Sequence, residues 1–340
     1  MKAAIVNPYF DTLGGGERYC ASVALALLES GYKVDIQWER KDILEKLRSR
    51  FGIDISKANI VSNVNRGDNY DVCFWVSDGS VPMLRSRKNI LHFQVPFTNV
   101  EGKTLINRMK LFRVRSIVCN SEFTKSFIDQ EFGVQSTVVY PPVDTLHIKP
   151  KRKENIILYV GRFSNLLQSK GQKVLIEAFG KLYDGGLKNW KLVLAGGMEV
   201  GVDEEITVLK KLAKGYPVTF LFSPSFTSIV ELFGRAKIFW SASGFDVDEV
   251  TSPQKVEHFG ITIVEAMSAG AIPMAVSKGG HKEIIKHGVN GYLWNTTDEL
   301  VSYTKSLITN NKMAKLKAES VKSAKIYSYD NFKTAFLSLL

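Results

Sequence analysis

The chain has 340 residues, 45% of them hydrophobic and 23% charged, which is the composition of an ordinary globular protein with enough length for two domains. No run of about 18 uncharged apolar residues occurs, so the sequence predicts no membrane-spanning helix. Lysine and arginine outnumber the acids and give a formal net charge of +11, which suits a phosphorylated substrate, an anionic membrane or nucleic acid without distinguishing among them.

The first half alternates strand-like and helix-like segments, as parallel α/β sheets do. We predict strands at Lys2–Asn7, Lys33–Gln37, Asp71–Val76, Asn89–Phe93, Ser116–Asn120 and Thr137–Tyr140. We predict helices at Glu17–Ser30, Ile43–Phe51 and Glu122–Phe132. The opening apolar stretch is too short for a signal peptide and is interpreted as a first buried strand, so we expect the protein in the cytoplasm.

A double proline after Tyr140 and the basic run that follows it predict a linker at residues 146–154. The alternation then restarts, with Asn155–Val160, Gln172–Tyr183, Trp190–Ala195, Glu204–Lys214, Val218–Phe222, Thr227–Arg235, Lys237–Ser241, Ile261–Ala269 and Ile272–Val276 in series. We therefore predict Rossmann-like domains at residues 1–145 and 155–325. A last helix within residues 326–340 is expected to pack back toward the first domain.

In open α/β sheets, ligands bind beyond the carboxyl ends of the strands. The loop after the first strand holds Gly14, Gly15 and Gly16, and adjacent glycines before a helix let the backbone approach a phosphate or a sugar hydroxyl. A tight turn would use the same glycines, so both interpretations stay open. The spacing is not G-x-G-x-x-G, which argues against a nicotinamide site.

Three further loops of this kind lie in the second half. Arg162 and Lys170 follow its first strand. The forked guanidinium of Arg162 and the mobile ammonium of Lys170 could neutralise the charge of a departing diphosphate. Two solvated surface cations would have the same sequence pattern, so this alternative stays open. Glu257 and Glu265 stand eight positions apart around the start of an apolar helix. Glu265 could accept hydrogen bonds from ribose hydroxyls, and Glu257 would lie beside the place where the helix N-terminus meets a phosphate. Alternatively, Glu257 is an acid at a helix start and Glu265 a capped or ion-paired acid of the core. The fourth loop, Lys278–Glu283, again has glycines at a strand end.

His92 ends a strand of the first half, a position that favours function over the structural role common for a lone histidine. Cys20, Cys73 and Cys119 lie in apolar segments without C-x-x-C spacing, which favours buried thiols over disulfides or zinc. No metal-ligand cluster and no cofactor motif is recognised, so we expect neither.

In this order the motifs resemble glycosyltransferase family 4, over nearly the whole chain. The matching segments are Gly14–Arg18, Asn120–Thr124, Tyr140–Asp144, Gly161–Arg162 with Lys170–Gly171, Glu257–Glu265 and Tyr327–Phe332. The resemblance implies the GT-B fold, in which two Rossmann-like domains face each other across a cleft. The triple glycine and the segment from Glu257 to Ile261 are most similar to the dolichol-pathway mannosyltransferases that use GDP-mannose.

The resemblance also implies roles for residues. The implied catalytic residues are Arg162, Lys170, Glu257 and His92, and the implied donor-binding residues are Gly15, Gly16, Arg162, Lys170, Phe259, Gly260, Ile261 and Glu265. Arg162 and Lys170 would bind the diphosphate, and Glu265 the ribose. Glu257, with the backbone amides around Phe259 and Gly260, would hold the donor sugar and phosphate, and Gly15 and Gly16 would lie near the diphosphate and acceptor. His92 would lie near the transferred sugar.

The implied reaction moves a hexose, with mannose as one candidate, from a GDP- or UDP-linked donor to a glycan or lipid-linked acceptor. It retains the anomeric configuration and uses no metal, no cofactor and no protein nucleophile, because the leaving phosphate accepts the acceptor's proton. An epimerase or phosphorylase of the same fold, or a non-catalytic relative that binds sugar nucleotides, remains an alternative. Nucleic acid is not an expected partner, since no aromatic–basic motif occurs.

Two features depart from the family pattern: an insertion at residues 243–252, and His281 in place of a small or apolar residue. The segment Lys103–Arg115 holds five basic residues and no acid. As a helix it would lie on anionic headgroups and bring a lipid-linked acceptor to the enzyme, or it would pack its apolar stripe on its own sheet.

Overall fold

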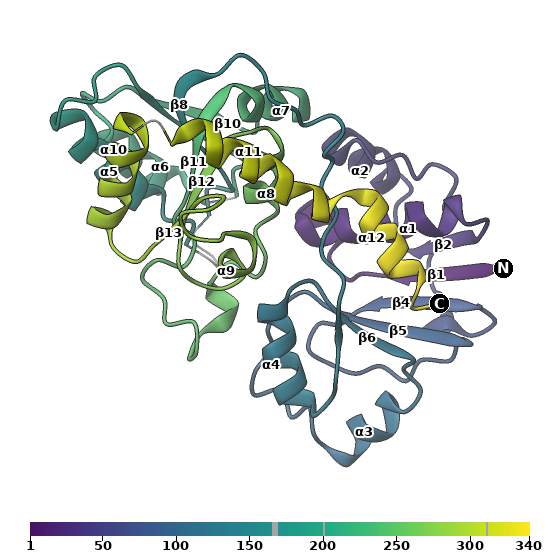
Figure 1. Cartoon of the computed structure of the whole chain (residues 1–340). Helices are drawn as coiled ribbons and strands as arrows, with labels where there is room; N and C mark the ends of the chain where they lie inside the picture. The colour runs from purple at the N-terminus through teal and green to yellow at the C-terminus, as the bar shows by residue number, and fades with distance from the viewer. Residues whose placement is uncertain (165–168, 200, 311) are drawn as a thin grey trace. The chain divides into compact units, whose positions relative to one another are not determined.

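A computed structural model of the chain describes residues 1–164, 169–199, 201–310 and 312–340. They form two compact units, one of Met1–Pro142 with Tyr329–Leu340 and the other of Val143–Ser328. Each unit is a parallel β-sheet with helices against both faces (Figure 1). The chain is therefore an α/β protein of two Rossmann-like units.

In the first unit the strand order is β3-β2-β1-β4-β5-β6-β7, and neighbouring strands run parallel. The strands are β1 (Lys2–Val6), β2 (Lys33–Gln37), β3 (Asn59–Val61), β4 (Val72–Val76), β5 (Lys88–Phe93), β6 (Ser116–Cys119) and β7 (Thr137–Val138). The helices are α1 (Gly15–Glu29), α2 (Ile43–Phe51), α3 (Leu105–Leu111), α4 (Glu122–Phe132) and α12 (Tyr329–Leu337). The order reverses between β1 and β4, where crossover connections diverge and leave room for a ligand.

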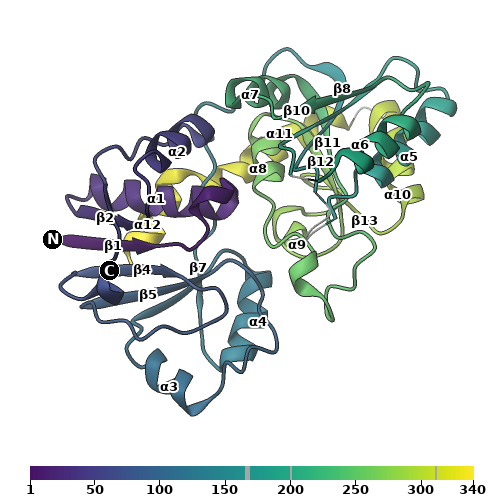
Figure 2. The same ribbon diagram turned by 180° about the vertical axis from the view of Figure 1, so that it is seen from behind.

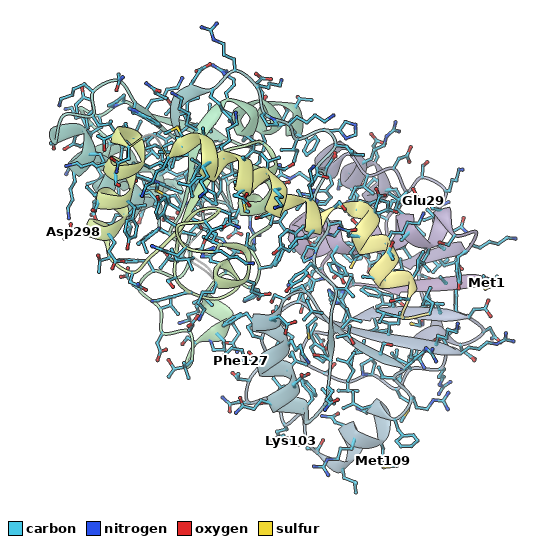
Figure 3. The ribbon with its side chains drawn as sticks, in the orientation of Figure 1. Met1, Glu29, Lys103, Met109, Phe127 and Asp298 are labelled. Atoms are coloured by element: carbon cyan, nitrogen blue, oxygen red, sulfur yellow. The ribbon has the colours of Figure 1, made fainter. Side chains whose placement is uncertain are left out.

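The last helix, α12, packs against α1 in this unit (Figure 1). The ring of Phe332 meets that of Tyr19 edge-on, with centroids 5.1 Å apart. At the rim, the Tyr329 hydroxyl donates to Glu29 at 2.8 Å, and Lys333 pairs with the same carboxylate at 2.9 Å. Figure 3 labels Glu29, the last residue of α1. The C-terminus thus completes the hydrophobic core of the first unit.

In the second unit the order is β10-β9-β8-β11-β12-β13, again with parallel neighbours (Figure 2). The strands are β8 (Glu154–Val160), β9 (Lys191–Gly196), β10 (Val218–Phe222), β11 (Ala236–Ser241), β12 (Ile272–Val276) and β13 (Tyr292–Trp294). The helices are α5 (Gln172–Asp184), α6 (Asp203–Leu212), α7 (Phe226–Arg235), α8 (Ile261–Ser268), α9 (His281–Ile284), α10 (Thr297–Thr309) and α11 (Met313–Ala324). Here the order reverses between β8 and β11.

The ends of the second unit lie together, because Val143 and Ser328 form an isolated parallel bridge. The Val143 N–H donates to the Tyr327 carbonyl at 2.8 Å. Residues 146–153, predicted as a linker, belong to this unit, and Glu154 begins β8. The strands β3 and β13 and the helices α9, α10 and α11 were not predicted from the sequence.

Candidate functional site

The candidate site of the second unit lies where the strand order reverses. The loop after β8 carries Arg162 and Lys170, and the loop after β11 leads to Glu257. These loops touch: a Cβ atom on Gly171 would lie 2.6 Å from the Cβ of Ala242. Gly171 also has a φ of +68°, which disfavours a side chain. Two residues from one loop and one from its neighbour are thereby brought to a single edge of the sheet.

Lys170 and Glu257 form the central pair of this site. The Lys170 Nζ donates to the Glu257 Oε2 at 3.0 Å, and the side chains are only 14% and 26% exposed. Burial alone would raise the pKa of Glu257, but the nearby charge of Lys170, followed by that of His281, outweighs burial and lowers this pKa to about 2. Glu257 is therefore a carboxylate at neutral pH.

Arg162 is half exposed and is held by a second acid. Its Nη1 lies 2.9 Å from the Oε1 of Glu199, which follows β9 and also accepts from the Ser164 hydroxyl. The Arg162 carbonyl accepts from the Gln172 amide at 2.9 Å, which fixes the backbone of the loop. The sequence analysis did not identify Glu199, although the glycine pair before it at the end of β9 is a signal of the same kind as the other loops.

The start of α8 lies beside this pair. Gly260, in the left-handed region with a φ of 113°, precedes Ile261, the first residue of the helix. Amides of a first helical turn sit at the positive end of the helix dipole, where they suit an anion. Phe259 is buried and its ring packs edge-on against Tyr327 at 5.3 Å, so only its backbone is placed for a ligand. Glu265 is buried in the second turn of α8.

Two polar side chains near the site are buried. Tyr159 on β8 has a hydroxyl with no hydrogen-bond partner among the described residues, and a Cβ on Gly161 would lie 2.2 Å from that oxygen. Burial, and secondarily the charge of Glu257, raises the pKa of Tyr159. The His281 Nδ1 lies 2.9 Å from the Val276 carbonyl, and burial lowers the pKa of this histidine. Both side chains are therefore neutral at physiological pH.

In the first unit, the glycine loop closes around Glu17. The Glu17 carboxylate accepts from the Gly14 N–H and from the Thr12 hydroxyl, each at 2.7 Å, and α1 begins at Gly15. A Cβ on Gly16 would lie 2.0 Å from the Gln94 Oε1, and the Gln94 amide donates to the Gly16 carbonyl at 3.3 Å. A side chain at position 16 would therefore displace the Gln94 amide from the glycine loop.

His92 lies inside the core of the first unit and has no exposed surface. Its ring stacks on Tyr19 with centroids 4.1 Å apart, its Nδ1 lies 3.1 Å from the Val118 carbonyl, and burial lowers its pKa to about 3. This position does not fit the role beside a transferred sugar that the resemblance implies. The residue of the same segment that reaches the glycine loop is Gln94, just beyond the end of β5.

A different surface of the first unit is formed by α3 and its ends. Leu105, Ile106, Met109 and Phe112 are 73%, 65%, 63% and 96% exposed. The expectation that this stripe packs on its own sheet is therefore wrong. Figure 3 labels Met109 on α3, at the periphery of the unit.

Cys20, Cys73 and Cys119 are buried and free. Within the described ranges, no group of three His, Cys, Asp or Glu side chains is arranged to hold a metal ion. None of the helices in the part of the chain that the structure describes has both the length and the apolar character needed to cross a membrane.

Comparison with known proteins identifies a family. The family described as "Glycosyl transferases group 1" matches residues 145–324, just over half of the chain. A relative from Candida glabrata, "Alpha-1,3/1,6-mannosyltransferase ALG2", is 27% identical over 84% of this chain and 78% of its own length. A relative from Dictyostelium discoideum, "GDP-Man:Man(3)GlcNAc(2)-PP-Dol alpha-1,2-mannosyltransferase", is 28% identical over 62% of this chain. The matched region spans only 43% of that second enzyme.

Solved structures share the fold. The structure of Anabaena Alr3699/HepE in complex with UDP and glucose superposes with a TM-score of 0.76, at 18% identity, over 99% of this chain and 98% of that one. Sucrose-phosphate synthase from Thermosynechococcus elongatus superposes with a TM-score of 0.74 at 14% identity. The fold is that of the GT-B glycosyltransferases.

Proposed function

The chain belongs to the group 1 glycosyl transferases, and on that premise we propose that it transfers a hexose from a nucleoside-diphosphate sugar to a glycan or lipid-linked acceptor. The observation that carries the proposal is the Lys170–Glu257 pair, with Arg162 on the same loop as Lys170, where the second sheet reverses its strand order. The relatives that are named mannosyltransferases support mannose as the hexose.

The charges of the cluster suit a reaction that releases a diphosphate. As the bond between sugar and diphosphate breaks, negative charge grows on the leaving oxygen. Arg162 and Lys170 would stabilise this charge, and the amides at the start of α8 would add their dipoles. Glu257, which is ionised, would accept hydrogen bonds from hydroxyls of the sugar, and Glu265 would accept them from the ribose.

The acceptor's proton also needs a destination. In the proposed reaction the departing diphosphate takes it, so the configuration is retained without a protein nucleophile, a metal or a cofactor. His92 has no place in this mechanism, because its buried ring reaches no surface. Gly15 and Gly16 of the first unit would provide backbone contacts on the acceptor side. The family match favours this transferase over an epimerase or a phosphorylase.

The test is ligand binding by the wild type and by an Arg162→Ala/Lys170→Ala double variant. We expect GDP or UDP to raise the melting temperature of the wild type in a concentration-dependent way. Because each charge-assisted contact contributes roughly 1.5–3 kcal/mol, the double variant should lose at least about tenfold in affinity. A Lys181→Ala variant, which removes an exposed lysine paired with Asp298, is the matched control. A double variant that binds as tightly as the control would refute the assigned site.

We propose further that α3 docks on an anionic membrane surface at the cytoplasmic face, where a lipid-linked acceptor would be presented. The exposed apolar side chains of α3 would enter the headgroup region, and the cations around them would meet anionic lipids. The cations are Lys103, Arg108, Lys110, Arg113 and Arg115. The name of the Dictyostelium relative, which includes a PP-Dol carrier, supports a lipid-linked acceptor.

This second proposal is tested by flotation with liposomes. Vesicles that contain anionic lipid should carry the protein at low salt, and binding should fade at high salt because surface charges are then screened. Purely zwitterionic vesicles are the control. Absence of binding at low salt would refute the membrane proposal and leave the transferase proposal intact.

A further inference from the structure

The insertion at residues 243–252 is tied to the turn that follows β12. The Lys278 Nζ donates to the carbonyl oxygens of Phe245 and Val247, both at 2.6 Å. In the opposite direction, the Glu249 carboxylate accepts from the Gly279 N–H at 2.6 Å. Side chains from both segments therefore hold the insertion against the turn.

Glu249 makes a second bond to the same turn. Its Oε1 lies 2.6 Å from the Nζ of Lys282, and the carboxylate is only 24% exposed. A charge-assisted bond to a backbone N–H and an ion pair on the other oxygen fix the carboxylate at two points. Loss of Glu249 would remove both contacts from the Gly279–Lys282 turn.

The Gly279–Lys282 turn lies against the backbone of Glu257. The Gly280 N–H donates to the Glu257 carbonyl at 2.9 Å. A Cβ on Gly279 would lie 2.2 Å from that same oxygen, and a Cβ on Gly280 would lie 2.5 Å from the His258 carbonyl. The glycines thus allow a contact so close that a shift of the turn is transmitted to Glu257.

The insertion itself is well folded and can act as a support. Phe245 packs on Trp294 with ring centroids 5.3 Å apart. Asp248 accepts from the Val250 N–H at 3.0 Å and from the Thr251 hydroxyl at 3.1 Å. Glu249 lies within the Asp248–Thr251 turn, so its carboxylate is presented from a fixed backbone.

We infer that Glu249 is a positioning residue for the donor sugar: it holds the Gly279–Gly280 turn against Glu257 and so fixes the carboxylate that receives the sugar. The inference rests on the proposed function and extends it to the insertion. The diphosphate contacts proposed for Arg162 and Lys170 come from the loop after β8. The described residues of this loop make no bond to Glu249 itself; the insertion reaches the loop through the Gly244 N–H, which donates to the Ser169 carbonyl at 3.4 Å. Binding of the sugar should therefore depend on Glu249 much more strongly than binding of the nucleoside diphosphate does.

The experiment separates these two parts of the donor. The affinities for GDP and UDP, and the KM and kcat for their hexose conjugates, are measured for the wild type, Glu249→Ala and Glu249→Gln. Glu231→Gln is the control, since it removes another carboxylate that pairs with a lysine in this unit. We expect Glu249→Ala to raise the KM for the sugar nucleotide about tenfold while the diphosphate affinity changes by less than about twofold.

Glu249→Gln keeps an acceptor oxygen for the Gly279 N–H and should recover part of the loss. A KM in Glu249→Ala equal to that of Glu231→Gln would overturn this inference alone. An equal loss of diphosphate affinity would also overturn it, because the insertion would then support the whole site rather than the sugar. A wild type that binds neither nucleotide would overturn the proposed function, and the inference with it.

Discussion

The Nζ of Lys170 and the Oε2 of Glu257 lie 3.0 Å apart, although 87 residues separate them in the chain. One comes from the loop after β8 and the other from the loop after β11. The pair therefore joins the two connections that leave the sheet at its reversal point, and the charge of Lys170 lowers the pKa of Glu257.

The first prediction concerns this dependence. The pKa of Glu257 is lowered from 4.5 to about 2 in the fold, so the unfolded chain binds its proton more tightly. Glu257 should contribute stability that is complete above about pH 4.5 and is lost as the pH falls toward 2. In Lys170→Met the pKa of Glu257 should rise, and the melting temperature should fall relative to Lys170→Met/Glu257→Gln at pH 7. A melting-temperature profile from pH 3 to 7 measures both effects, and identical profiles would rule out the coupling.

The second prediction concerns Glu199. In the proposed reaction Arg162 exchanges the Glu199 carboxylate for the donor diphosphate, so we expect removal of the Glu199 charge to help the donor bind. Glu199→Gln should tighten GDP or UDP binding by about two- to fivefold, as expected for a partly exposed ion pair. Asp298→Asn, which removes an 82% exposed acid with the same change in net charge, is the control. Calorimetry measures the affinity of both variants for GDP and UDP. Weaker binding by Glu199→Gln would contradict the proposed exchange.

The third prediction is a pH dependence of the first unit. Burial lowers the pKa of His92 from 6.5 to about 3, so protonation favours the unfolded chain. Stability should be complete above about pH 6.5 and should fall below it, by up to about 1.4 kcal/mol per pH unit. His92→Phe keeps a ring against Tyr19 without a titrating group and should flatten this part of the profile. His147→Gln, at an exposed histidine, should not. An unchanged slope in His92→Phe would contradict the buried assignment.

The fourth prediction tests α3. Met109→Ser/Phe112→Ser should abolish flotation with anionic liposomes, because it removes two of the four exposed apolar side chains on that surface. Both are exposed, so the free energy of unfolding should change by less than about 0.5 kcal/mol. Val250→Ser, at a 73% exposed position of the second unit, is the control. Retained flotation in the double variant would show that charge alone drives binding.

The sequence predicts most of the fold because polar residues and glycines mark the ends of its helices and strands. The predicted ranges of β2, α2, α4, β10 and β12 agree with the structure residue for residue. The strands β3 and β13 were missed because each has only three residues and lies at an edge of its sheet. Three residues are too few to show an alternation of apolar and polar side chains. The predicted strand Thr137–Tyr140 is shorter in the structure, where only Thr137 and Val138 pair with β6.

The position of a candidate residue was predictable where it follows a strand, and its surroundings were not where a neighbouring element decides them. Arg162, Lys170 and Glu257 were selected from loop position, and the structure brings Lys170 and Glu257 into contact, while their roles stay predictions. His92 was misplaced because β5 is buried on both faces, so alternation does not reveal that this ring faces Tyr19 of α1. The bond between Glu249 and Gly279 joins segments 30 residues apart, and no local pattern encodes such a contact.

The bridge between Val143 and Ser328 has a consequence for engineering. The second unit is a cassette inserted into the first unit, with its entry and exit adjacent. A chimaera that exchanges the whole cassette with that of a relative keeps the contacts of α12 with Tyr19 and Phe74. Only the two neighbouring junctions between cassette and first unit then need to match. A truncation after residue 142, by contrast, removes α12, which is part of the hydrophobic core of the first unit.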